Sequence, residues 1–229
     1  MVDIKLLVFD WDGTLMDSEA HIVSCMQFAI ASLALEPRSA DQVKNIIGLG
    51  LHEAVLGLYP EADASLVRTL ADRYREHWLA GNQRSQLFPG VEDTLQLLKD
   101  EGFRLAVATG KGRCGLDKVL DETGLGGLFD ATRCSDETRS KPHPMMLEQI
   151  MTELDIAPDQ TIMIGDTEYD MAMARNAQAH PVAVSYGVHE WARLAQHAPL
   201  TCLDRFTELS DWLAERGQAD VPAALTGSD

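Results

Sequence analysis

The sequence predicts an α/β protein with a doubly wound parallel sheet and a small inserted helical domain. Two observations predict this class. Short apolar runs alternate along the chain with longer amphipathic stretches, and each run ends in polar or glycine-rich residues. One long stretch, residues 16–83, interrupts the alternation, which resumes after it. A sheet whose strands are joined by helices produces the first pattern, and an inserted domain produces the second.

Five runs fit buried parallel strands, because a sheet covered on both faces requires strands that are apolar throughout. They are residues 5–9, 104–108, 129–134, 161–164 and 181–184. Between them lie helical stretches at residues 91–100, 116–123, 144–154 and 169–177. Functional residues are then expected beyond the carboxyl ends of the strands, where open α/β sheets bind ligands.

Residues 16–83 contain no convincing strand and fit a succession of amphipathic helices. Apolar residues recur there at helical spacing, first at Ile22, Met26, Ile30 and Leu33. Ser39 followed by Gln42 has the pattern of a capping box, which starts a helix. The loop that contains Gly48, Leu49 and Gly50 is our candidate for a segment that enters the site, since glycine lets backbone approach a ligand closely.

These patterns predict a Rossmann-like core of residues 1–15 and 84–216 that carries a helical cap at residues 16–83. A tail of residues 217–229, rich in small and polar residues, is expected to be flexible. A helical continuation of the core is the alternative for residues 16–83. The return of the strand-helix rhythm directly after residue 90 favours the insert.

The charge and the cysteines limit the function. Only 19 lysines and arginines stand against 36 aspartates and glutamates, for a net charge of −17, which argues against nucleic acid and anionic membranes as partners. No apolar run approaches the roughly 20 residues that span a bilayer, and no signal-peptide pattern is present, so a cytoplasmic location is expected. The four cysteines form no Cys-x-x-Cys pair and are expected to be reduced and buried.

Two acids follow the first strand directly. Asp10 and Asp12 stand two residues apart, so in an extended segment they project to the same side. Such a pair favours a bound proton or cation, and one acid can attack a substrate while the other transfers a proton. A polar turn is the alternative. A calcium loop of the EF-hand type would need further ligands that the following residues do not supply.

A second acid pair, Asp166 and Asp170, follows the fourth strand. At a spacing of four residues both are expected on one face of the first helical turn, where they would repel each other without a cation. Carboxylate oxygens suit Mg²⁺, which keeps water and substrate phosphate as its other ligands. The alternative is that one of them caps the helix.

Between the acid pairs stand three residues suited to phosphate. Thr109 and Gly110 end the second strand, where a hydroxyl and backbone amides near a helix start can bind an anion. Lys141 lies in a loop with two prolines, which would fix its ammonium. Taken singly, Thr109 is more often an ordinary strand-end hydroxyl, and Lys141 a solvated lysine.

The order of these segments is specific, because each stands at a strand end or in the following loop. They resemble the four consecutive motifs of haloacid dehalogenase-like hydrolases, here Asp10-Trp11-Asp12-Gly13-Thr14, Thr109-Gly110, Lys141-Pro142 and Gly165-Asp166-Thr167-Glu168-Tyr169-Asp170. The resemblance covers nearly the whole chain, and the place of the helical insert is similar to that in the phosphoglycolate phosphatase-like branch. It implies a phosphatase, since the dehalogenases lack the second aspartate, here Asp12.

The resemblance also implies roles. Asp10 would attack phosphorus and become an aspartyl phosphate, while Asp12 would protonate the leaving oxygen and later deprotonate water. Thr109, Gly110 and Lys141 would hold the phosphoryl oxygens. Mg²⁺ would be held by Asp10, the backbone carbonyl of Asp12 and Asp166, with Asp170 in a supporting position. The expected substrate is a small phosphorylated metabolite such as phosphoglycolate, a sugar phosphate or a nucleotide monophosphate.

Other functions stay open at this point. A pyrophosphatase of the same superfamily would use the same core. A phosphomutase is disfavoured, because the mutases of this branch carry a histidine where this chain has Ile22, and His21 stands one place early. A histidine near the start of an amphipathic helix is more often a partly exposed surface residue or a packing residue. A receiver-like phosphoacceptor is also disfavoured, since a receiver needs neither the insert nor Asp12. The intact set of charged residues argues against a protein that only binds partners.

Overall fold

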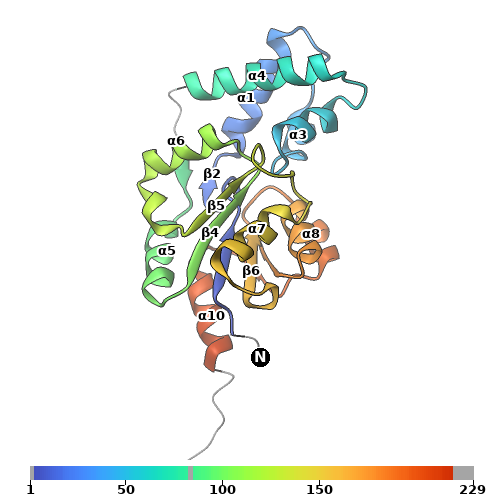
Figure 1. The fold of residues 1–229 in the computed structure, drawn as a ribbon. Coiled ribbons are helices and arrows are strands. Elements are labelled where there is room, and N and C mark those ends of the chain that lie inside the picture. The colour runs from blue at the N-terminus through green and yellow to red at the C-terminus, as the bar shows by residue number, and fades with distance from the viewer. Residues whose placement is uncertain (1–2, 82–84, 219–229) are drawn as a thin grey trace, which may run out of the picture.

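The computed structural model describes residues 3–81 and 85–218. A six-stranded sheet forms its centre, with every neighbouring pair parallel and the strands in the order β5–β4–β1–β6–β7–β8 (Figure 1). The strands are β1 (Leu6–Phe9), β4 (Arg104–Thr109), β5 (Ala131–Cys134), β6 (Thr161–Gly165), β7 (His180–Val184) and β8 (Cys202–Leu203). The first five confirm the predicted strands to within two residues at each end. The two-residue β8 is too short to give a periodic signal and was not predicted.

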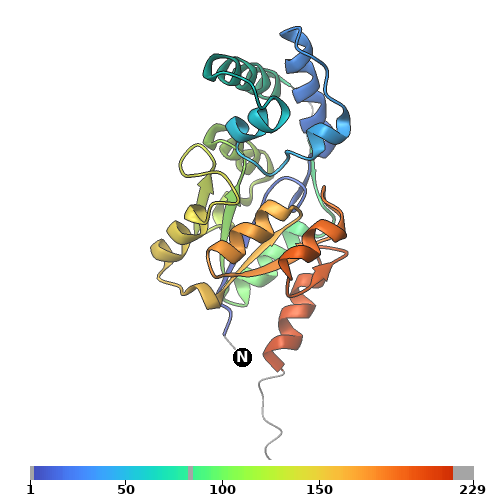
Figure 2. The same ribbon diagram turned by 90° about the vertical axis from the view of Figure 1, so that its right-hand side faces the viewer.

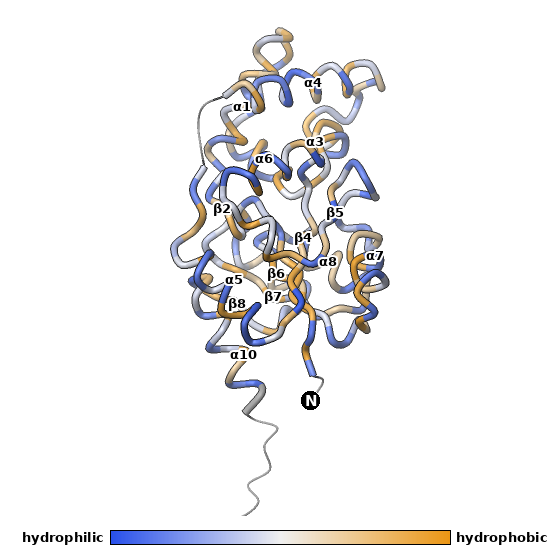
Figure 3. Tube along the Cα trace, turned by 60° about the vertical axis from the view of Figure 1, so that its left-hand side comes forward, coloured by the Kyte–Doolittle hydropathy of each residue, from blue (hydrophilic) through white to orange (hydrophobic). Residues whose placement is uncertain are grey.

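Helices cover both faces of the sheet, as a doubly wound fold requires (Figure 1). One face packs on α5 (Val91–Asp100), α6 (Arg113–Thr123) and α10 (Glu208–Gln218), and the other on α7 (Met145–Leu154) and α8 (Glu168–Asn176). The residues of β1 alternate between the two apolar clusters, and all four are fully buried. Figure 3 shows the sheet strands β6 and β7 as largely hydrophobic segments. The shorter elements are α9 (Trp191–Leu194) and the 3-10 helices Leu125–Leu128, Pro158–Gln160 and Ala195–His197.

Four helices lie together over the carboxyl edge of the sheet (Figures 1 and 2). They are α1 (Glu19–Ser32), α2 (Ala40–Lys44), α3 (Leu51–Leu58) and α4 (Ala64–Ala80), and we call them the helical group. The group has an apolar cluster of its own, which includes the predicted Ile22, Met26 and Ile30. The capping box of Ser39 and Gln42 is present at the start of α2.

Two details differ from the sequence prediction. Residues 16–83 do contain a strand, the short β2 (Met16–Asp17), which pairs antiparallel with β3 (Gln86–Leu87). The two segments that connect the sheet to the helical group, which contain β2 and β3, therefore lie side by side. Helix α10 continues to Gln218, so residues 217–218 belong to a helix; residues 219–229 and the boundary expected at 83–84 lie outside the described residues. None of the described helices is long and apolar enough to cross a membrane.

Candidate active site

The predicted acids meet at the carboxyl edge of the sheet. Asp10 follows β1 and Asp166 follows β6, and these strands are hydrogen-bonded neighbours. Carboxylate oxygens of Asp10, Asp166 and Asp170 lie within 4.8 Å of one another, and all three residues are buried. The strand ends therefore bring together acids that are far apart in sequence; Asp10 and Asp170 are separated by 160 residues.

A buried lysine pairs with two acids of this cluster. The Nζ atom of Lys141 lies 2.8 Å from Oδ1 of Asp10 and 2.7 Å from Oδ1 of Asp170, and its side chain is 0% exposed. Burial lowers the pKa of Lys141, but the Asp10 and Asp170 carboxylates outweigh burial and raise it overall. The solvated-lysine alternative for Lys141 is therefore wrong.

Asp166 and Asp170 are not arranged as predicted. Asp166 precedes helix α8, and its Oδ1 and Oδ2 accept hydrogen bonds from Thr14 Oγ1 and the Val188 N–H, both at 2.9 Å. Asp170 forms a capping box with Thr167, the residue that caps α8, so Asp170 takes part in capping the helix, but it also lies in the acid cluster. The helical-turn prediction failed because the helix starts two residues after Asp166.

Burial perturbs the acids strongly. It raises the pKa of Asp10 well above the usual range, against the opposing effect of Lys141, and Asp170 and Asp166 raise it further. The pKa of Asp166 is raised to about 7, first by burial and then by Asp170. Within the described residues, Asp10 Oδ2 is buried and accepts no hydrogen bond, while the Trp11 N–H donates to Asp10 Oδ1. A buried carboxylate oxygen of this kind is suited to a cation.

Asp12 lies apart from that cluster, and its surroundings contain a lysine that sequence reasoning missed. Oδ1 of Asp12 accepts a hydrogen bond from Ser18 Oγ at 2.5 Å and lies 3.0 Å from Nζ of this lysine, Lys111. The place of Lys111 two residues after Thr109, at a strand end, was a signal that could have identified it. The backbone carbonyl of Asp12 as a metal ligand stays a prediction.

Thr109 and Gly110 have different surroundings. Thr109 is fully buried, and its Oγ1 accepts a hydrogen bond from the Lys111 N–H at 3.2 Å. Gly110 lines the cavity above the acids, whereas Thr109 does not. A side chain at Gly110 would place Cβ 2.7 Å from the Gly48 carbonyl oxygen and 2.6 Å from that of Leu49, so a glycine is required for this approach.

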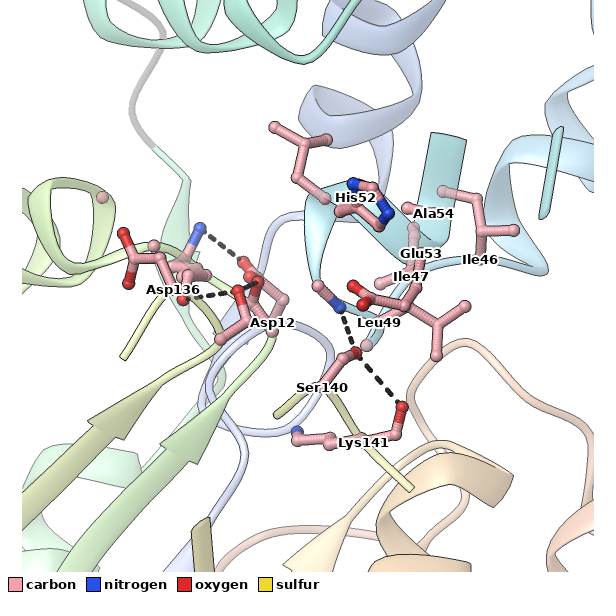
Figure 4. Close-up of a pocket in the computed structure, with 18 of the residues that line it drawn as sticks. Asp12, Ile46, Ile47, Leu49, His52, Glu53, Ala54, Asp136, Ser140 and Lys141 are labelled. Carbon is pink, nitrogen blue, oxygen red and sulfur yellow. Dashed lines mark hydrogen bonds and ion pairs between the residues drawn. The ribbon is translucent and has the colours of Figure 1, made fainter. Parts of the chain in front are cut away.

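The cavity has a volume of about 1000 Å³ and lies between the strand ends and the helical group. The loop of Gly48, Leu49 and Gly50 lines it, as predicted, and the Gly50 N–H donates to Ser140 Oγ at 2.7 Å. Figure 4 shows Ser140 facing this loop, the Lys141 side chain below Ser140, and Asp12 at the other side of the pocket.

The cysteines and His21 were also the subject of sequence predictions. All four cysteines are free, but only Cys25 and Cys134 are buried; Cys114 is exposed and lines the cavity, which corrects the expectation of buried thiols. His21 is 8% exposed and stacks on Trp78, so it is a packing residue in this structure.

Comparisons with known proteins identify the family of the chain. Residues 7–184 match the family model of haloacid dehalogenase-like hydrolases. "Probable phosphatase IndB" of Dickeya dadantii is 33% identical over 210 residues, 89% of this chain and 91% of that protein. The phosphoglycolate phosphatase of Psychrobacter arcticus is 28% identical and covers 93% of this chain and 96% of its own length.

A solved structure gives the same result. The crystal structure of "a predicted phosphatase" from Clostridium acetobutylicum superposes with a TM-score of 0.85 at 27% identity, over 93% of this chain and all of that one. The chain therefore belongs to the haloacid dehalogenase-like hydrolase family, in its phosphoglycolate phosphatase-like branch.

Proposed function

We propose that this phosphatase hydrolyses a small phosphorylated metabolite with the help of Mg²⁺, through an aspartyl phosphate formed on Asp10. The observation that carries the proposal is the buried group of Asp10, Asp166, Asp170 and Lys141, of which Asp10 and Lys141 line the cavity. The relatives named as phosphatases support the same reaction class.

The residues present fit Mg²⁺. Three carboxylates converge with oxygen donors only, and Asp10 Oδ2 accepts no hydrogen bond from the described part of the chain. Asp10, Asp166 and the backbone carbonyl of Asp12 would hold the ion, with Asp170 in support. When bound, the ion would neutralise charge on the phosphoryl oxygens.

The residues of the chain then divide the work in two steps. In the first, an Asp10 oxygen forms a bond to phosphorus while the bond from phosphorus to the leaving oxygen breaks, and Asp12 gives its proton to that oxygen. In the second, Asp12 takes a proton from water as the water oxygen attacks phosphorus, the bond to Asp10 breaks and phosphate is released. Lys141 and the Gly110 backbone, which both line the cavity, would hold the phosphoryl oxygens. The same role for Thr109, which does not line the cavity, stays a prediction.

The helical group would act as a cap over this reaction. We assign residues 16–83 to the cap and residues 1–15 and 84–216 to the catalytic core. The group already contacts the core where Gly50 meets Ser140, so closure would exclude water while the phosphoenzyme forms, and opening would admit it. A lid of this kind favours a small metabolite over a phosphoprotein.

Phosphoglycolate is the first substrate to test, because relatives are named phosphoglycolate phosphatases. A cavity of about 1000 Å³ also accommodates larger esters, so the set should include sugar phosphates, nucleotide monophosphates and pyrophosphate. Phosphate release is measured with Mg²⁺ and with a chelator, and substrates are ranked by kcat/KM.

We expect many turnovers with Mg²⁺ and none after chelation. Release of at most one phosphate per protein would indicate a receiver-like phosphoacceptor instead. Interconversion of two phosphate esters without phosphate release would indicate a mutase.

A further inference from the structure

We propose that Lys111 positions Asp12 for proton transfer and is itself held by Trp78 of the helical group. The inference rests on the proposed function, since it assigns a partner to the proton-transferring acid. It makes Lys111 a positioning residue that acts through Asp12.

The contacts of Asp12 support the first part of this inference, that Lys111 positions Asp12. Lys111 Nζ and Ser18 Oγ both lie against Oδ1, and the described residues provide no hydrogen bond to Oδ2. The two partners therefore fix the plane of the carboxyl group and leave Oδ2 to exchange the proton. The side chains of Lys111 and Asp12 are only 9% and 10% exposed, so bulk water screens this ion pair less than it screens a surface pair. Both residues line the cavity.

The contacts of Lys111 carry the second step. Its Nζ lies 4.5 Å from the centre of the Trp78 ring, within the range of a cation–π interaction. Trp78 belongs to α4 of the helical group, whereas Lys111 follows β4 of the sheet. One ammonium thus joins the helical group to the acid. Because a lysine side chain is flexible, an aromatic face that restricts it also restricts the carboxylate it holds.

The chain contains a matched control. Lys118 Nζ lies 5.0 Å from the centre of the same Trp78 ring but forms no described contact with Asp12; it donates instead to the Leu79 carbonyl. Lys118→Met therefore removes a charge from the same ring without removing the partner of Asp12. Lys111→Met removes both a charge from the ring and the partner of Asp12.

The test uses two esters of similar size in the full-length protein with Mg²⁺. Benzyl phosphate has a basic leaving oxygen that requires protonation, whereas p-nitrophenyl phosphate has a leaving group that departs as an anion. General acid catalysis typically contributes 10²- to 10⁴-fold, and a positioning partner contributes part of that. We expect Lys111→Met to lower kcat for benzyl phosphate about tenfold or more beyond its effect on p-nitrophenyl phosphate.

Lys111→Arg should restore most of the benzyl phosphate rate, because arginine can still pair with the carboxylate. Trp78→Leu should change the ratio of the two rates in the same direction by a smaller factor, and Lys118→Met should leave this ratio as in the unaltered protein. Thermal unfolding of each variant checks that it is folded, and Lys111→Gln serves if the methionine variant is not.

Equal losses on both esters in Lys111→Met, or an equal change of the ratio in Lys118→Met, would overturn the positioning role. The unaltered protein distinguishes this failure from a failure of the proposed function. If it turns over neither ester with Mg²⁺, the phosphatase proposal itself fails and the role of Lys111 fails with it.

Discussion

Two lysines pair with aspartates at the same edge of the sheet, but in different surroundings. Lys141 is 0% exposed and lies between two carboxylates, Asp10 and Asp170. Lys111 is at the cavity wall, pairs with Asp12 alone and has an aromatic ring of the helical group as its other neighbour. The comparison separates a part of the site that the sheet fixes from a part that depends on the helical group.

The difference follows from where each lysine is anchored. Lys141 is held in a loop against β1 and α8, so both of its partners belong to the core. A charge so deeply buried is stable only while its partners remain. Lys111 has one partner in the core, Asp12, and one in the helical group, Trp78. We therefore expect the first pair to determine whether the site exists and the second to determine how well it transfers protons.

The largest effect is expected at Asp10. Asp10→Asn should lower kcat at least about a thousandfold, because the amide cannot act as an anionic nucleophile. The fold should persist, since the side chain keeps its shape. Phosphate release and circular dichroism are the measurements. Retention of more than a few per cent of activity, in protein free of deamidation, would contradict the role of Asp10.

Removal of the buried lysine comes next. Lys141→Met leaves the Asp10, Asp170 and Asp166 carboxylates without their cation, and breaking a buried pair in this way typically costs about 3–5 kcal/mol. Activity should be lost as well. Lys111→Met is the comparison and should cost less, because Asp12 lines the cavity and keeps Ser18 as a hydrogen-bond partner. Urea unfolding measures both; equal costs would remove the distinction between the two pairs.

The raised pKa of Asp166, about 7 against 3.8 for the free side chain, predicts a pH-dependent response to Mg²⁺. An acid whose pKa rises on folding stabilises the metal-free protein below the unfolded pKa, and this contribution is lost as pH rises through the folded pKa. Mg²⁺ competes with the proton, so it should raise Tm more at pH 8 than at pH 5.5.

The control for this experiment is Asp166→Asn, in which the difference between the two pH values should become smaller; Asp10, whose pKa burial also raises, would maintain the rest. An equal rise of Tm at both pH values in the unaltered protein would argue against Mg²⁺ binding to the ionised acid.

A smaller and more selective effect is expected at Gly110. In Gly110→Ala the new Cβ would lie under 3 Å from the carbonyl oxygens of Gly48 and Leu49, which would displace the loop of the helical group. The kcat/KM for the best metabolite should fall several-fold more than that for p-nitrophenyl phosphate. Gly127→Ala is the control, because a Cβ there meets nothing within 4 Å. Equal losses of kcat/KM on both substrates would indicate that the substitution disturbs the catalytic residues of the core and not the loop of the helical group.

The smallest effect is expected at His21, which sequence comparison places near the histidine of the mutases. In this structure it packs against Trp78. His21→Ala should therefore lower the free energy of unfolding by about 1 kcal/mol and leave kcat within a factor of two or three. A much larger loss of kcat would restore a functional role for His21.

The sequence predicted the sheet well, because buried parallel strands such as β1 and β6 are unbroken apolar runs that end in acids. It failed for β2, β3 and β8, since two residues carry no period. Among the site residues, the positions of Asp10, Asp166 and Lys141 followed from strand order. The pairing of Lys111 with Asp12 did not, because it depends on a side-chain contact between loops that no spacing specifies.

The aspartyl phosphate itself can be trapped. The protein is mixed rapidly with its best substrate and Mg²⁺, denatured, and treated with borohydride, which reduces an acyl phosphate to an alcohol. Peptide mass spectrometry then locates the altered residue. We predict homoserine at position 10, in an amount that falls to background without substrate or in Asp10→Asn. Reduction at another aspartate, or steady turnover with no reduced residue at any time, would contradict Asp10 as the nucleophile.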